Sequence, residues 1–133
     1  MSYVRPLFHW EGHGCKGDLM SRRLVLRVMR RMVAVSGMTA WGRAHVRVMS
    51  EEDGAGRAMG WGLSGFKFIA ESHVAVHTDA RDGLVCVQVF SCRDFTGRSL
   101  GKELHRILSP ARAYENTVET ALEVSEWNPN LVS

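Results

Sequence analysis

Three short apolar runs follow one another closely between residues 66 and 91, and they constrain the fold more than any other feature of the chain. The runs at 66–70, 74–78 and 84–91 are rich in Val and Phe, which favour extended structure. The second and third runs are separated by residues 79–83, Asp-Ala-Arg-Asp-Gly, which is typical of a turn. Strands joined by such short connections usually pair with each other, so we expect an antiparallel sheet.

Two segments have the residue spacing of amphipathic helices. In the first, apolar residues recur at helical spacing from Leu19 onward while arginines occupy other positions; these apolar residues are Val25, Val28, Met29, Met32 and Val33. Asp18 or Ser21 can cap the start of this helix, and Gly37 can end it. The second helix is marked by Leu100, Leu104, Ile107 and Leu108. Pro110 ends it.

The remaining segments complete an expected single domain over residues 1–133. Further strands are expected at 6–11, around 44–48 and at 113–124, because apolar residues alternate there or are bounded by glycine. The polar, glycine-rich stretch at 50–62 is expected to be a loop. Together these elements predict the α+β class, with an antiparallel sheet and helices packed on one face.

Composition narrows the classes of function. The net charge is +3, and we interpret the run of arginines in the first helix as a solvated face, so nucleic acid is not an expected partner. The sequence contains no long apolar span, so we do not expect a membrane partner either. The three cysteines lack a metal-type or disulfide-type spacing, which indicates a cytoplasmic location and no metal site. A chain of 133 residues builds a modest core, so we expect a homodimer.

Chemically reactive residue types are concentrated between residues 62 and 92. The segment contains a Gly-x-Ser-Gly stretch, a Glu-Ser-His triplet, a His-Thr pair and a cysteine after the last apolar run; the residues are Ser64, Glu71-Ser72-His73, His77-Thr78 and Cys92. In residue types and spacing this segment resembles the core of the short prokaryotic S-adenosylmethionine decarboxylases. The resemblance extends more loosely to Gly14-Cys15 and to the order of the elements.

The resemblance implies a self-cleaving enzyme with a pyruvoyl cofactor. In such an enzyme the Ser72 hydroxyl attacks the Glu71 carbonyl, the backbone is cut between the two residues, and Ser72 becomes the pyruvoyl group. The products are a β chain, residues 1–71, and an α chain, residues 72–133. A decarboxylase needs this carbonyl because no ordinary side chain can hold the electron pair that departing carbon dioxide leaves behind.

The same resemblance implies roles for three other residues. Ser64 would assist the acyl shift by hydrogen bonding at the scissile carbonyl, and His77 would remove the α-proton of the esterified Ser72. In the mature enzyme the substrate amine would form a Schiff base with the pyruvoyl ketone, and Cys92 would protonate the carbanion left after carbon dioxide departs. Taken singly, each of these residues also has an ordinary structural interpretation; the match at fixed offsets favours the functional one.

The positions that would contact the substrate depart from the family pattern. Members that act on S-adenosylmethionine carry Trp-Pro-Glu after the His-Thr pair and an aromatic residue that stacks on the adenine. Here Asp79-Ala80-Arg81 and Ala58 stand at those places, with Trp61 nearby. Asp79 can pair with a cationic tail, which favours L-ornithine or L-arginine and makes Asp79 and Trp61 the candidate substrate-binding residues. Asp79 can also be a solvated turn residue.

Two alternatives stay open beside that substrate. The first is S-adenosylmethionine decarboxylation, which supplies the aminopropyl donor for spermidine, so both substrates belong to polyamine biosynthesis. The second is of another class, a non-catalytic regulatory paralogue with an uncut chain, because a fold alone does not confer an activity.

Overall fold

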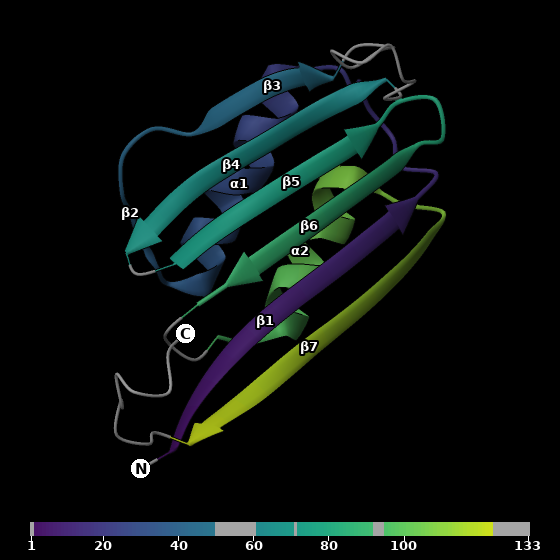
Figure 1. Ribbon diagram of the computed structural model, residues 1–133. Coiled ribbons are helices and arrows are strands. Elements are labelled where there is room, and N and C mark those ends of the chain that lie inside the picture. The colour runs from purple at the N-terminus through teal and green to yellow at the C-terminus, as the bar shows by residue number, and fades with distance from the viewer. Residues whose placement is uncertain (1, 50–60, 71, 92–94, 124–133) are drawn as a thin grey trace, which may run out of the picture.

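The computed structural model describes residues 2–49, 61–70, 72–91 and 95–123, which form one antiparallel sheet and two helices (Figure 1). The strands are β1 (Ser2–His13), β2 (Thr39–Ala40), β3 (His45–Met49), β4 (Gly62–Ala70), β5 (Ser72–Asp79), β6 (Leu84–Phe90) and β7 (Arg112–Glu123). The helices are α1 (Arg22–Ser36) and α2 (Gly97–Leu108). The expected α+β class is confirmed.

The order of strands in the sheet differs from their order in the sequence. The order is β2-β4-β5-β6-β1-β7, and β3 also pairs with β4. Every pairing is antiparallel. The first strand therefore lies between β6 and β7, as the purple ribbon beside the yellow one in Figure 1 shows. This arrangement interleaves the N-terminal and C-terminal parts of the chain.

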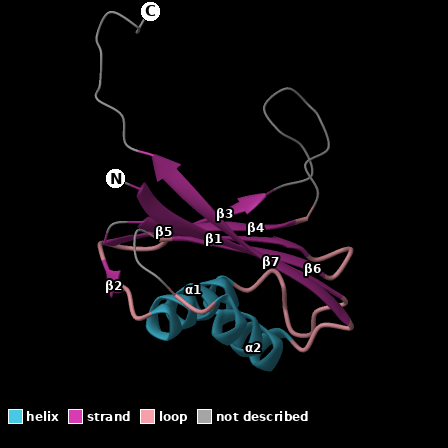
Figure 2. Ribbon diagram, turned by 90° about the horizontal axis from the view of Figure 1, so that it is seen from below, coloured by secondary structure: helices cyan, strands magenta, loops and turns pink. Residues whose placement is uncertain are grey.

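Both helices cover the same face of the sheet, as expected (Figure 2). The side chain of Ser21 accepts a hydrogen bond from the Leu24 amide at the start of α1, and Gly37 ends the helix with a left-handed φ of 72°. Of the two expected caps, Ser21 is therefore the one used. The apolar residues of the two helices pack with alternate residues of β1, β4, β5 and β6 to form the core.

The fourth strand begins earlier than the sequence predicted. The expected loop ran to Gly62 and the expected strand began at Phe66, whereas β4 begins at Gly62. Glycine is needed there because the helix and the next strand approach closely. A Cβ at Gly65 would lie 2.7 Å from Val25 of α1, and one at Gly62 would lie 1.7 Å from the Thr78 carbonyl oxygen. The two glycines are packing positions rather than loop signals.

The sheet face opposite the helices, which we name the open face, carries aromatic side chains. Phe66 stacks on His73 with ring centroids 5.4 Å apart, and His73 lies 5.8 Å from Phe90. Phe68 is 52% exposed and meets Trp41, which is 68% exposed. In the described part of the chain, no helix has the length and apolar character needed to cross a membrane.

Candidate active site

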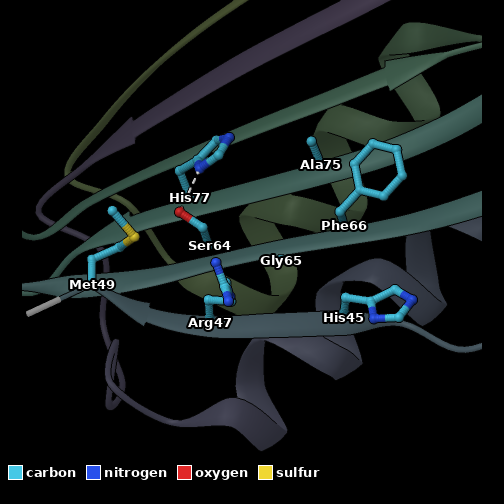
Figure 3. Close-up of a pocket in the computed structure, with 8 residues that line it drawn as sticks. All are labelled: His45, Arg47, Met49, Ser64, Gly65, Phe66, Ala75 and His77. Atoms are coloured by element: carbon cyan, nitrogen blue, oxygen red, sulfur yellow. Dashed lines mark hydrogen bonds between the residues drawn. The ribbon is translucent and has the colours of Figure 1, made fainter. Parts of the chain in front are cut away.

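Two of the predicted site residues meet on the open face. Ser64 of β4 and His77 of β5 are direct partners in the strand register. The Ser64 Oγ and the His77 Nδ1 lie 2.9 Å apart and form a hydrogen bond, drawn as a dashed line in Figure 3. The bond fixes the orientation of the imidazole ring whichever of the two atoms carries the hydrogen. A hydroxyl and an imidazole in contact can donate, accept and transfer protons.

The strand register extends this pair into a polar row across the open face. Arg47 of β3 lies directly opposite Ser64, and Cys86 of β6 lies directly opposite His77. Glu11 of β1 lies opposite Cys86 in turn. Burial, together with the smaller effects of the Glu11 charge and hydrogen bond and of the nearby Cys15, raises the pKa of the Cys86 thiol to about 11. The Cys86 thiol is therefore protonated at neutral pH.

A cavity of about 250 Å³ opens beside the Ser64–His77 pair. It is lined by His45, Arg47, Met49, Ser64, Gly65, Phe66, Ala75 and His77 (Figure 3). Among these lining residues are one guanidinium and two imidazoles and no carboxylate. The cavity therefore suits a ligand with an apolar part and a negatively charged or hydrogen-bond-accepting part.

Thr78, the second member of the His-Thr pair, points to the opposite face. Its hydroxyl accepts a hydrogen bond from the Leu63 amide at 2.9 Å and donates one to the Leu19 carbonyl at 2.8 Å. It thereby ties β4 and β5 to the segment that leads into α1. The geometry gives Thr78 a structural role, which holds the strand that carries His77.

Within one copy of the chain, Ser72 lies apart from the Ser64–His77 pair. Ser72 is the first residue of β5, pairs with Ile69, and comes five residues before His77. A strand rises about 3.3 Å per residue, so the two residues are about 16 Å apart. Because successive side chains alternate between faces, Ser72 and His77 also project from opposite faces. Glu71 and Cys92 lie outside the described residues.

The candidate substrate-binding residues lie at the turn after β5. The Asp79 carboxylate accepts a hydrogen bond from the Arg81 amide at 3.1 Å, which is the local bond of a turn residue. Trp61 is 40% exposed, and its carbonyl accepts a hydrogen bond from the Ala80 amide. Neither residue lines the cavity beside His77. Ala58 lies outside the described residues.

The sequence reasoning missed two cavity residues, His45 and Arg47. Both belong to β3, and strand alternation puts them on one face with Met49. Alternation alone could have grouped these residues. Their position beside Ser64 could not have been derived from the sequence. It depends on the register of β3 on β4, and the long connection from 50 to 61 does not set that register as a short turn would.

In the described part of the chain there is no group of three or more His, Cys, Asp or Glu side chains that could hold a metal ion. The reactive groups on the open face are hydroxyl, imidazole, thiol, carboxylate and guanidinium. They support proton transfer and recognition of charge.

Comparison with known proteins relates this chain to one family. The family model described as S-adenosylmethionine decarboxylase matches residues 8–120. The fold is similar to the crystal structure of the adenosylmethionine decarboxylase from Aquifex aeolicus, with a TM-score of 0.71 and 19% sequence identity. The similarity covers 95% of this chain and 98% of that chain. No curated protein matched the sequence.

Proposed function

This chain belongs to the S-adenosylmethionine decarboxylase family, and we propose that it is a self-processing, pyruvoyl-dependent decarboxylase. The observation that carries the proposal is the 2.9 Å hydrogen bond between Ser64 and His77. The family resemblance gives both residues roles in assisting self-cleavage at Ser72.

Self-cleavage can be written with every bond accounted for. The Ser72 hydroxyl oxygen attacks the Glu71 carbonyl carbon, the peptide C–N bond breaks, and an ester forms with a free amine on residue 72. His77 then removes the α-proton of residue 72, and the Cβ–O bond breaks to release the Glu71 carboxylate. The remaining enamine tautomerises and is hydrolysed by water, which releases ammonia and leaves a ketone.

A pyruvoyl group at position 72 would supply a carbonyl that accepts electrons from the substrate as carbon dioxide leaves. Ser72 fits this use because it is the first residue of β5, separated by one residue from Ala70, where β4 ends. A chain end can form there while the pairs from Ser64–His77 to Ile69–Ser72 keep the strands together. Cys92 is the proposed proton donor for the carbon that loses carbon dioxide.

The reacting residues would meet between two copies of the chain. In one copy the Ser64–His77 pair is about 16 Å from Ser72, which is too far for proton transfer. The pair and its cavity lie on the open face, and Figure 2 shows α1 and α2 on the other face of the sheet. We therefore propose a homodimer in which the Ser64–His77 pair of one copy serves the 71–72 bond of the other. The exposed aromatic side chains on the open face support such an interface.

The first candidate substrate is a basic amino acid, L-ornithine or L-arginine. It is favoured by the acid Asp79, which stands where relatives carry tryptophan, and by Ala58, which stands at the adenine-stacking position. The Asp79 carboxylate keeps a second oxygen beside the one that the Arg81 amide contacts. That oxygen can pair with an ammonium or guanidinium tail.

A different observation supports S-adenosylmethionine as the second candidate. Trp41 and Phe68 are exposed aromatic residues with ring centroids 6.4 Å apart. They lie at the same end of the sheet as Ser72, because β2 pairs with β4 next to the β4–β5 connection. Such a pair offers a surface on which a flat heterocycle can stack, in place of the aromatic residue missing at position 58. Both substrates would put the chain in polyamine biosynthesis, in the cytoplasm.

Intact mass of the purified protein tests the proposal. We expect two chains that end at residue 71 and begin at residue 72, the second carrying a ketone that reacts with amines. Ser72→Ala should give one uncut chain without activity, whereas Ser99→Ala, an exposed serine of α2, should be processed normally. Cys92→Ala should leave cleavage intact and lower turnover by on the order of 100-fold. An uncut wild-type chain with an unmodified serine would favour the non-catalytic paralogue.

Release of carbon dioxide from labelled substrates distinguishes the two candidates. L-ornithine, L-arginine and S-adenosylmethionine are assayed side by side with the processed protein. The acid at position 79 predicts turnover of a basic amino acid and its loss in Asp79→Asn. Turnover of S-adenosylmethionine with loss of activity in Trp41→Ala would assign the substrate to the aromatic surface instead.

A further inference from the structure

We infer that Arg47 binds the carboxylate of the amino-acid substrate. The inference rests on the proposed decarboxylase function and identifies a substrate contact within that site. It holds for all three candidate substrates, since each carries a carboxylate on the carbon next to its amino group.

The strand register places Arg47 beside the reactive pair. Arg47 is the direct partner of Ser64 on β3, and Ser64 is the direct partner of His77. Direct partners in an antiparallel sheet have Cβ atoms about 5 Å apart, so the guanidinium can reach any ligand that touches Ser64. In Figure 3 the Arg47 side chain extends from β3 toward Ser64. The lining of one cavity includes all three residues.

The side chains that line the cavity favour an anionic ligand. Arg47, His45 and His77 line it, and none of its described lining residues is an acid. Arg47 forms no ion pair with another described residue, whereas Arg31 and Arg106 both pair with Glu103. Covering the open face with a second copy would remove Arg47 from water, and a desolvated guanidinium is costly without an anionic partner. A substrate carboxylate meets that requirement.

The shape of the guanidinium fits this ligand. It presents a planar set of N–H donors that matches the two oxygens of a carboxylate, which an ammonium group cannot do. Phe66, Met49 and Ala75 supply an apolar wall next to it. We therefore expect a ligand that has a carboxylate followed by carbon atoms. An amino acid has this arrangement, because its carboxylate is bonded to the α-carbon.

Uncut protein provides a test that does not depend on catalysis. Isotope-labelled Ser72→Ala protein is titrated with L-ornithine and with putrescine, the same molecule without its carboxylate, while the Nε–H signal of Arg47 is followed by NMR. The pairs L-arginine and agmatine, and S-adenosylmethionine and its decarboxylated form, are compared in the same way. We expect the Arg47 signal to move with the carboxylate-bearing member of at least one pair and not with its amine. Arg43, which lies outside the cavity, should not respond.

Processed protein provides the second readout. Arg47→Gln should raise KM about 10- to 100-fold, the range expected for one charge-assisted hydrogen-bonded contact, while kcat changes less. Arg47→Lys should recover part of the loss, and Arg43→Gln should leave KM unchanged. Intact mass of each variant shows whether self-cleavage is preserved.

The outcomes separate this inference from the proposed function. If the wild-type chain stays uncut, the proposed function fails, and the titration of the uncut protein still decides the role of Arg47. If no carboxylate moves the Arg47 signal, the inference is overturned. It is also overturned if Arg47→Gln dissociates the homodimer and leaves the preference for the carboxylate-bearing ligand over its amine unchanged. In that case Arg47 pairs with an acid of the second copy.

Discussion

His77 is hydrogen-bonded to Ser64 through its Nδ1. In the tautomer whose Nδ1–H donates to the Ser64 Oγ, the Nε2 carries a lone pair and can take a proton. In the proposed cleavage that proton comes from the α-carbon of residue 72, after the ester has formed. His77→Ala should therefore block elimination without preventing attack by the Ser72 hydroxyl.

We predict that the His77→Ala chain accumulates the ester. Its mass stays that of the full chain, but hydroxylamine, which cleaves esters and spares peptide bonds, should split it between residues 71 and 72. The Ser72→Ala chain treated in the same way should stay whole. A His77→Ala chain that hydroxylamine cannot split would mean that His77 acts in the first step instead.

At the scale of single residues, the sequence identified only those site residues that belong to a motif. Ser64 and His77 were expected as site residues from the family resemblance of one segment, and the structure brings them into contact. Arg47 and Cys86 lie in the same polar row but were not predicted, because cross-strand neighbours are set by register. For Cys86 a signal existed. The turn at 79–83 pairs Asp79 with Leu84, and the same register places His77 opposite Cys86.

At the scale of elements, helices were predicted more accurately than strand ends. The apolar spacing and caps of α1 determine its limits locally, since Ser21 and Gly37 satisfy the helix ends. The start of β4 depends on contacts with α1 and with β5, and the local sequence does not determine these contacts. The short strand β2 was not predicted, because two residues show no alternation.

The two helices are joined by an ion cluster whose pH dependence is testable. Glu103 of α2 accepts hydrogen bonds from Arg106 of the same helix and from Arg31 of α1, the latter at 2.8 Å. The hydrogen bond from Arg106 is the largest influence that lowers the pKa of Glu103, to about 2 from its ordinary 4.5. The depressed pKa means that the folded chain holds the carboxylate charged more strongly than the unfolded chain does.

We predict that Glu103→Gln lowers the free energy of unfolding by about 1 kcal/mol at pH 7, the upper end of the range for surface ion pairs, because the arginine partners are partly exposed although Glu103 is largely buried. The difference from wild type should be complete above pH 4.5 and should disappear as the pH falls to about 2, because the unfolded carboxyl protonates first. Urea melts measure it, since guanidinium salts would screen the pairs. Glu119→Gln, an exposed acid of β7, should show no such pH-dependent difference.

At the scale of the whole molecule, the strand order explains how a cut chain can stay folded. Cleavage after residue 71 would leave β1 to β4 with α1 in one piece, and β5 to β7 with α2 in the other. In the sheet β1 lies between β6 and β7, and β4 pairs with β5. Separating the pieces would break three strand pairings, so both should stay in one native particle.

The division of the site between copies predicts complementation between two inactive chains. Ser72→Ala keeps the Ser64–His77 pair and has no serine to cleave, whereas His77→Ala keeps the serine and has no base. If the pair serves the same copy, co-expression of the two leaves both chains uncut. If it serves the other copy, each mixed dimer contains one complete site, and random pairing should cut about half of the His77→Ala chains and none of the Ser72→Ala chains.

Different affinity tags on the two chains allow intact mass to assign each fragment, and His77→Ala expressed alone gives the background. Cleavage confined to mixed dimers follows from the distance of about 16 Å between Ser72 and His77, since no side-chain rotation within one chain spans it.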